Sequence, residues 1–305
     1  TPSCSGIWSD AHVDAWRPIT KFIAEQGSVS GIQIAHGGRK ASHTEPWNTP
    51  TRHLGSDEKG WQIVGPSAIT FDGSFGTPQE LTNQEIAEIT QQFVDGALYS
   101  LEAGFKVVEL HFAHGYLASS FMSPLSNHRE DEYGGSLENR CRFALETITE
   151  IRKAIPESAP LFVRISSSEF VEGGWDIEDS VQIAKWMKDA GVDLVDASAG
   201  GNSADQVLKL SPGYQVPFAD AIRNQAGIMT AAVGLITEAK QAEEILQAGQ
   251  ADAVFIGREL MRNPYWSLYA QAQLDGESDR WAKQYKPSSF DFKYTGPSEV
   301  ISTSS

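Results

Sequence analysis

Residues 102–112 read EAGFKVVELHF, which is the end of a helix, a glycine and then a short, largely apolar run. Glycine readily adopts the left-handed conformation that ends many helices, and such a run is typical of a strand covered on both faces of a parallel sheet. The same order recurs in EQGSVSGIQI at 25–34, DAGVDLVDA at 189–197 and QAGQADAVFI at 247–256. Repeated helix–loop–strand units are joined by right-handed crossovers. The pattern predicts an α/β protein, either a barrel or a doubly wound sheet.

Six such runs are predicted as strands, and helices with start and stop signals lie between them. The clearest helix start is the string TNQE at 82–85, where the Thr and Glu side chains can satisfy free amides of the first turn. No G-x-G-x-x-G string follows a predicted strand, which argues against a dinucleotide-binding Rossmann fold. The predicted strands are Gly31–His36, Val107–Phe112, Leu161–Ser166, Leu194–Ser198, Met229–Gly234 and Ala253–Gly257, and four predicted helices stop at Gly27, Gly104, Gly191 and Gly249.

Composition narrows the class of protein. The chain has 305 residues, with 24 basic against 40 acidic side chains and a net charge of -16. Such an acidic chain repels phosphate backbones and anionic lipids, so neither nucleic acid nor a membrane is expected as a partner. No apolar run approaches the roughly 20 residues of a membrane span. Cys4 and Cys141 stand in no metal or redox spacing, which excludes a disulfide scaffold and is compatible with the cytoplasm.

The second predicted strand ends in the string HFAHGY at 111–116. Ligands of parallel α/β sheets bind beyond the carboxyl ends of the strands, so His111, His114 and Tyr116 are candidate catalytic residues. An imidazole can donate to a carbonyl or nitro oxygen, and a tyrosine hydroxyl can deliver a proton. Two alternatives stay open: His-x-x-His can ligate zinc, although no third ligand has supporting spacing, and the histidines can simply fill a loop.

Arg164 and Gln33 each interrupt an apolar run. A buried guanidinium is costly unless it meets an anion or several acceptors, so Arg164 points to a ligand that carries or develops negative charge. An amide donates and accepts together, so Gln33 suits the edge of a heterocycle. The alternatives are an internal ion pair of Arg164 with a carboxylate such as Glu109, and a core amide at Gln33 that is satisfied by its neighbours.

The last two predicted strands end in glycine, at Gly234 and at Gly257-Arg258. In barrels, the loops after the last two strands commonly bind phosphate, because glycine lets the backbone approach and arginine adds a forked donor. Each glycine alone could be an ordinary turn residue. Together with the preceding residues, the pattern describes a phosphate site, a heterocycle site and a proton donor, which suits a phosphorylated heterocyclic cofactor with an electrophilic substrate above it.

The strings that carry these residues resemble the Old Yellow Enzyme family of flavin-dependent ene reductases, and most of all its thermophilic-like and xenobiotic-reductase-like class. The similarity covers about residues 6–270, and its most specific part is the long string at 111–143. The matching strings are GIWSDAH (6–12), GIQIAHGGRKAS (31–42), HFAHGYLASSFMSPLSNHREDEYGGSLENRCRF (111–143), LFVRIS (161–166), GVDLVDASAG (191–200) and VFIGRELMRNPYW (254–266).

The resemblance implies a (β/α)8 barrel of the TIM type, with FMN reduced by NADPH or NADH. It implies that the flavin passes hydride to an activated alkene, an α,β-unsaturated carbonyl or nitro compound. By position, His111 and His114 would hold the carbonyl or nitro oxygen, and Tyr116 would protonate the α-carbon. No metal is implied.

The resemblance also assigns the cofactor contacts. Gln33 and Arg164 would bind the flavin pyrimidine, and Arg164 would stabilise the negative charge that builds near N1 on reduction. Gly234, Gly257 and Arg258 would hold the FMN phosphate.

The family's first two strands lie before its GIWSD-like string, so the first two βα units are expected to be missing from this chain. The prediction is an incomplete barrel over 1–286, with a long loop at 37–80 over the substrate and a disordered tail at 287–305. The unpaired edges of the strands at Gly31–His36 and Ala253–Gly257 would then face the gap left by the missing units. The alternative is a non-catalytic truncated remnant with weak or no FMN binding.

Members of this class often end in Gln-Tyr-x-Arg, whose arginine reaches a neighbouring subunit. Here the corresponding residues are Gln284-Tyr285-Lys286-Pro287, so that arginine is absent. A homo-oligomer remains compatible with the resemblance, without this particular contact.

Overall fold

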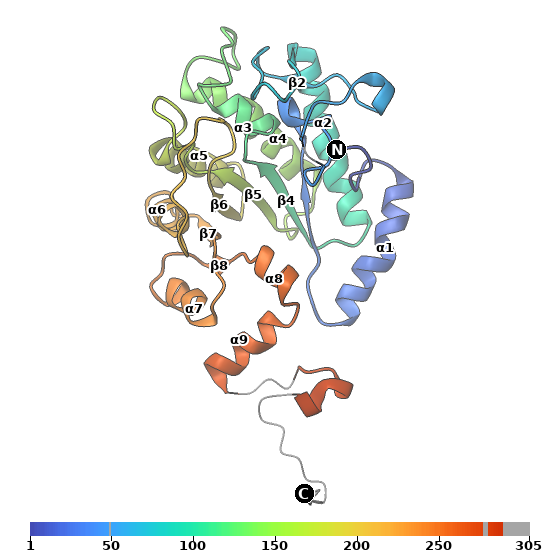
Figure 1. Cartoon of the computed structure of the whole chain (residues 1–305), viewed down its shortest axis with the longest axis vertical. Coiled ribbons are helices and arrows are strands. Elements are labelled where there is room, and N and C mark those ends of the chain that lie inside the picture. The colour runs from blue at the N-terminus through green and yellow to red at the C-terminus, as the bar shows by residue number, and fades with distance from the viewer. Residues whose placement is uncertain (49, 277–279, 289–305) are drawn as a thin grey trace, which may run out of the picture.

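The computed structural model describes residues 1–48, 50–276 and 280–288, and it is built on one parallel sheet of six strands. The strand order is β1-β4-β5-β6-β7-β8, so each strand lies beside the next one along the chain. Figure 1 shows the sheet curling from β1 to β8, with helices packed around its outside. The strands are β1 Gly31–Ile34, β4 Val107–Phe112, β5 Leu161–Ser166, β6 Leu194–Ser198, β7 Met229–Ala232 and β8 Ala253–Val254.

The α/β prediction is confirmed, and the expected barrel is a half-barrel. Within the described residues β1 pairs only with β4 and β8 only with β7, so the sheet has two edges. Three predicted strands have the predicted bounds, whereas β1, β7 and β8 stop two or three residues early. The residues beyond those ends include Gly234 and Gly257, where the chain turns out of the sheet.

Helices cover the convex side of the sheet. Val108, Leu110 and Phe112 of β4 point outward and are 0% exposed, and Phe112 packs its ring edge against Phe93 of α2. This apolar layer is the main hydrophobic core. The helices are α1 Asp10–Glu25, α2 Asn83–Glu102, α3 Leu117–Met122, α4 Leu137–Ala154, α5 Ile177–Asp189, α6 Val216–Ala226, α7 Ala239–Gln247, α8 Arg258–Arg262 and α9 Trp266–Asp275.

The predicted helix signals act as expected at both ends of α2. The Thr82 hydroxyl accepts from the Glu85 amide, and the Glu85 carboxylate accepts from the Thr82 amide, which is the capping box. Gly104 follows the helix with a φ of 98°, a left-handed value that a side chain would disfavour. The glycine therefore lets the chain turn sharply from α2 into β4.

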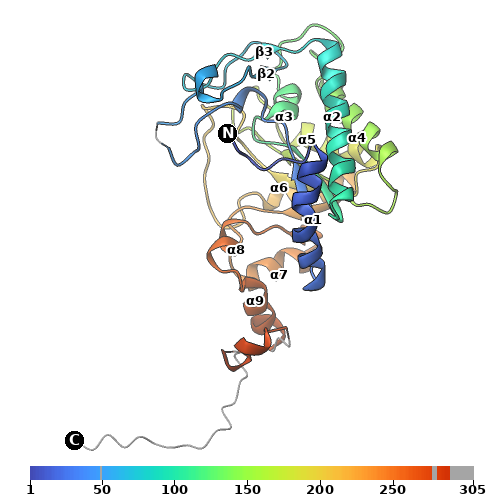
Figure 2. The same ribbon diagram turned by 90° about the vertical axis from the view of Figure 1, so that its right-hand side faces the viewer.

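Segment 37–80, whose described residues are 37–48 and 50–80, forms a long connection after β1. It contains the 3-10 turns η1 Gly38–Lys40 and η2 Ser56–Glu58, and a small parallel pair of strands, β2 Val64–Gly65 and β3 Gln79–Glu80. Figure 2 shows β2 and β3 at the same end of the molecule as α3, which follows the carboxyl end of β4. The segment thus lies at the end of the sheet where parallel folds bind ligands.

At the other end of the chain, Lys283–Ser288 form the 3-10 helix η3, so the predicted tail begins within an ordered turn. Residues 289–305 of the predicted tail lie outside the described residues. No helix among the described residues is long and apolar enough to cross a membrane.

Candidate active site

The concave face of the sheet is polar where the convex face is apolar. Because paired residues of neighbouring strands share a face, His111 of β4, Arg164 of β5 and Asp196 of β6 point inward as one row. Glu109 precedes His111 on the same face of β4 and pairs with Gln33 of β1. The Gln33 side-chain amide donates to the Glu109 carboxylate. The sheet therefore brings together side chains from four strands that are far apart in the sequence.

His111 and His114 form a hydrogen-bonded pair. His111 Nδ1 accepts from the Ala113 amide at 3.3 Å, which leaves the proton on Nε2, and that atom is 3.2 Å from His114 Nδ1. His114 Nε2 then donates to Ser198 Oγ at 2.7 Å. Burial lowers the pKa of His111 to about 4 and that of His114 to about 3, helped by the Arg164 charge. Both imidazoles are therefore neutral donors near pH 7.

The backbone at His114 is unusual. This residue has a φ of 59°, in the left-handed region that few side chains adopt, and its amide donates to Ser166 Oγ at 2.8 Å. Gly115 and Gly201 approach so closely here that a Cβ on Gly201 would lie 2.7 Å from His114 Cα. The imidazole is held by its surroundings in a strained backbone position, which is common at functional sites.

Tyr116 lies at the start of α3, with its ring edge-to-face against His111 at 4.9 Å between centroids. Burial raises the pKa of the phenol, so its proton is present at neutral pH. The hydroxyl makes no hydrogen bond to another described residue and is not sealed from solvent. It is therefore available to donate to a ligand.

Lys40 is a neighbour of this cluster that the sequence analysis did not single out. Its Nζ donates to the carbonyl oxygens of His114 at 2.9 Å and Gly201 at 2.8 Å, and lies 5.5 Å from the centre of the Tyr116 ring. Phe71, from segment 37–80, stacks on the same ammonium at 4.3 Å. Burial, aided by the charge of Arg39, lowers the pKa of Lys40 to about 8. Its place in the string GGRKAS, in the loop that follows the first strand, was the available signal.

Arg164 forms an internal ion pair, as in the alternative above, and the carboxylate is that of Asp196 instead of Glu109. Its Nε lies 3.0 Å from Asp196 Oδ2, whereas Glu109 is hydrogen-bonded to Gln33. The approach to Asp196 lacks hydrogen-bond geometry, and Arg164 Nε is buried without a hydrogen-bond partner. One other contact, Nη2 to Ser198 Oγ, is long at 3.4 Å. Arg164 thus keeps unused donors on the concave face, which fits an acceptor-rich ring such as the flavin pyrimidine.

The three candidate phosphate contacts follow the ends of the paired strands β7 and β8. Ala232 pairs with Val254, and the Phe255 amide donates to the Ala232 carbonyl, so the chains leave the sheet side by side toward Gly234 and Gly257. Gly234 has a φ of 116°, and a Cβ there would lie 3.0 Å from Gln215 Nε2. Gly257 opens onto free space and caps α8, whose first residue is the exposed Arg258. Open backbone beside a guanidinium fits a phosphate group.

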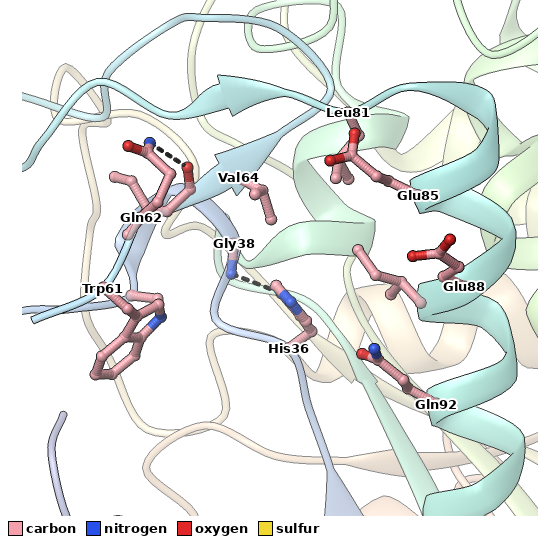
Figure 3. Close-up of a pocket in the computed structure, with 12 residues that line it drawn as sticks. His36, Gly38, Trp61, Gln62, Val64, Leu81, Glu85, Glu88 and Gln92 are labelled. Carbon is pink, nitrogen blue, oxygen red and sulfur yellow. Dashed lines mark hydrogen bonds between the residues drawn. The ribbon is translucent and has the colours of Figure 1, made fainter.

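A separate cavity of about 240 Å³ lies between α2 and segment 37–80. Figure 3 shows His36 and Trp61 on its walls, with Glu85 and Glu88 of α2 on another side. Burial lowers the pKa of His36 to about 4, and its Nδ1 accepts from the Gly38 amide. None of the predicted site residues lines this cavity. Among the described residues no group of His, Cys, Asp and Glu is arranged to hold a metal ion.

The chain is similar in sequence to a family of flavin oxidoreductases and to bacterial NADPH dehydrogenases. The model of the NADH:flavin oxidoreductase / NADH oxidase family matches residues 1–277. NADPH dehydrogenase of Bacillus subtilis is 48% identical over 273 residues, which is 89% of this chain and 75% of that protein.

Two solved structures are also similar. The old yellow enzyme homologue from Zymomonas mobilis has a TM-score of 0.70 at 27% identity, covering 90% of this chain and 74% of that one. A complex of 2-naphthoyl-CoA reductase has a TM-score of 0.76 at 26% identity, and covers 89% of this chain but only 42% of that longer one.

Proposed function

The chain belongs to the NADH:flavin oxidoreductase / NADH oxidase family and is an FMN-dependent NAD(P)H oxidoreductase, and we propose that its substrates are α,β-unsaturated carbonyl or nitro compounds. The observation that carries the proposal is the cluster beyond β4. Two neutral imidazoles, His111 and His114, lie beside the free hydroxyl of Tyr116 on the face that Arg164 shares. Hydrogen-bond donors and a proton donor that lie side by side suit an alkene activated by an oxygen substituent.

We assign the cofactor contacts by the fit of the residues. Gln33 donates to Glu109 through its nitrogen, so its carbonyl oxygen is left to accept from an N–H of the pyrimidine. We assign Arg164 to the same ring, because its one hydrogen bond to a described residue, from Nη2 to Ser198 Oγ, is long and leaves terminal N–H groups to donate. Gly234, Gly257 and Arg258 take the phosphate. When bound, the flavin supplies the hydride that the residues themselves cannot provide.

The other site residues bind the substrate, protonate it and shield it from solvent. His111 gives up its hydrogen bond to His114, and His114 gives up its hydrogen bond to Ser198, so that the Nε2–H of each ring donates to the substrate oxygen and draws electron density away from the double bond. Tyr116 gives its proton to the α-carbon and regains one from water. Phe71 and the adjoining part of segment 37–80 lie over Lys40, and we assign them to the wall that shields this transfer from solvent.

The test is reconstitution with FMN followed by two half-reactions under anaerobic conditions. We expect the protein to retain FMN after gel filtration, NADPH to bleach the flavin band, and cyclohex-2-enone or 1-nitrocyclohexene to restore it. Cyclohexene, which lacks the oxygen substituent, serves as the control substrate and should leave the flavin reduced. Flavin that is bleached but never reoxidised by either activated alkene would contradict the substrate class.

A matched pair of variants tests the cofactor contacts. Arg164→Ala should weaken FMN binding about 10- to 100-fold, because charged hydrogen bonds contribute roughly 1.5–3 kcal/mol. Arg223→Ala is the control, since Arg223 makes a similar ion pair with Asp252 at 3.0 Å outside the proposed site. Equal FMN affinity in the wild type and in Arg164→Ala would remove Arg164 from the cofactor site. A wild-type protein that never retains FMN would instead favour the non-catalytic alternative.

A further inference from the structure

The side chain of Asp196 lies on the concave face, and its carboxyl group is buried without a hydrogen bond to compensate. It is 0% exposed, and neither of its carboxyl oxygens has a hydrogen-bond partner among the described residues. Its one ion pair among the described residues is with Arg164, at 3.0 Å. An ionised carboxylate without hydrogen bonds in a low-dielectric interior is costly, and an unassisted ion pair recovers only part of that cost. A group held under such conditions is poised to change its protonation state.

The surroundings of Asp196 favour the protonated form. β5 contributes Arg164, β4 contributes Glu109 and the neutral His111, and β7 contributes Ala231, which cannot titrate. Burial raises the pKa of Asp196 to about 7; the Arg164 charge opposes this rise and the Glu109 charge adds to it. Asp196 therefore changes charge near neutral pH, directly behind the guanidinium that we assign to the flavin pyrimidine.

We propose that Asp196 is a positioning residue for Arg164 that also takes up one proton from solvent when the flavin is reduced. The proposal rests on the proposed function above. Its physical basis is the local charge. With Glu109 and Asp196 ionised, the cluster with Arg164 carries one net negative charge. When FMN is bound, its reduction by hydride from NAD(P)H would add two electrons and one proton, and therefore one negative charge, at the site that we assign beside Arg164. A proton on the Asp196 carboxylate cancels that addition, so each reduction takes up two protons in total.

The measurable consequence is a steeper pH dependence of the flavin midpoint potential. One extra proton per two electrons changes the equilibrium tenfold per pH unit, which is about 30 mV. We expect the wild-type potential to fall by this additional amount per pH unit above about pH 7, where oxidised-state Asp196 has lost its proton. Asp196→Asn keeps the shape and removes the titration, so its potential should match the wild type below that pH and lie higher above it.

The experiment is spectroelectrochemical titration of the FMN-loaded protein from about pH 6 to about pH 9. Glu109→Gln is the second variant: because the Glu109 charge raises the pKa of Asp196, its removal should move the start of the steep segment to lower pH. Asp252→Asn is the matched control, because Asp252 also pairs with an arginine at 3.0 Å but outside the proposed site. The control should keep the wild-type slope.

Each outcome decides the proposal. A wild-type slope that steepens above neutrality, is lost in Asp196→Asn and is shifted in Glu109→Gln supports it. Identical slopes in the wild type and Asp196→Asn overturn it while leaving the proposed function intact. Loss of the steep segment in Glu109→Gln alone would identify Glu109 as the proton acceptor and also overturn it. If Asp196→Asn does not fold, the Glu109→Gln variant decides. A steep segment that starts at lower pH than in the wild type supports the proposal, and one that does not move to lower pH overturns it. Wild-type protein that does not retain FMN overturns both proposals.

Discussion

The two faces of β4 differ in what their side chains do. Val108, Leu110 and Phe112 point outward into the helices and are completely buried, whereas Glu109 and His111, between them in sequence, point inward among polar groups. Successive side chains of a strand project to opposite faces, so one six-residue strand contributes to the core and to the site at once. The comparison teaches that stability and chemistry can be perturbed separately here, by choosing odd or even positions of the same strand.

The largest expected effect is on the outer face. Phe112→Ala should lower the free energy of unfolding by about 3–5 kcal/mol, because it removes a fully buried ring and leaves a cavity against Phe93. Phe162→Ala is the matched control: Phe162 lies beside Glu109 on the inner face and is only partly buried. Urea unfolding at equilibrium measures both. A Phe162→Ala loss as large as that of Phe112→Ala would break the distinction between the faces.

The inner face should give a kinetic effect instead. Tyr116→Phe should slow reoxidation of the flavin by an activated alkene about 100-fold or more, the low end of the usual contribution of a general acid. Reduction of the flavin by NADPH and the urea midpoint should stay near wild type, because the missing hydroxyl makes no hydrogen bond to another described residue. Stopped-flow measurement of the two half-reactions separates these effects. An equal loss in both half-reactions would remove Tyr116 from the proton-donor role.

The same contrast explains what the sequence could predict. The outer face is encoded locally: apolar runs gave β4, β5 and β6 with their observed bounds, and the Thr82 box and Gly104 marked the ends of α2. β1, β7 and β8 end earlier than predicted. After β7 and β8 the chain turns out of the sheet toward Gly234 and Gly257, whose positive or irregular backbone angles composition does not reveal.

The inner face depends on register between strands far apart in the sequence. The histidines and Tyr116 could be singled out because three polar groups follow one strand. The pairing of Arg164 with Asp196, 32 positions along the chain, could not, because nothing in the string LVDAS distinguishes this carboxyl from any other. Lys40 was missed for the same reason: its contacts with His114 and Gly201 exist only after the sheet has formed.

The effect expected to vanish at neutral pH is a contribution of the inner face to the pH dependence of stability. In the unfolded chain a histidine titrates near 6.5, whereas the pKa of His111 is about 4 and that of His114 about 3 in the folded protein. Between these values the unfolded state binds more protons than the native state, so stability falls as the pH drops below about 6.5. Each histidine contributes at most about 1.4 kcal/mol per pH unit in this window.

Urea unfolding at a series of pH values compares the wild type with His111→Gln/His114→Gln. The double variant should lose stability less steeply between about pH 6.5 and about pH 4, because its side chains bind no proton there. Tyr116→Phe is the control from the same cluster, since a phenol whose pKa is raised by burial stays neutral throughout this range and should keep the wild-type slope. An unchanged slope in the double variant would mean that the histidines are protonated as readily in the folded protein as in the unfolded chain. They could not then serve as neutral donors whose charge is suppressed by burial and by Arg164.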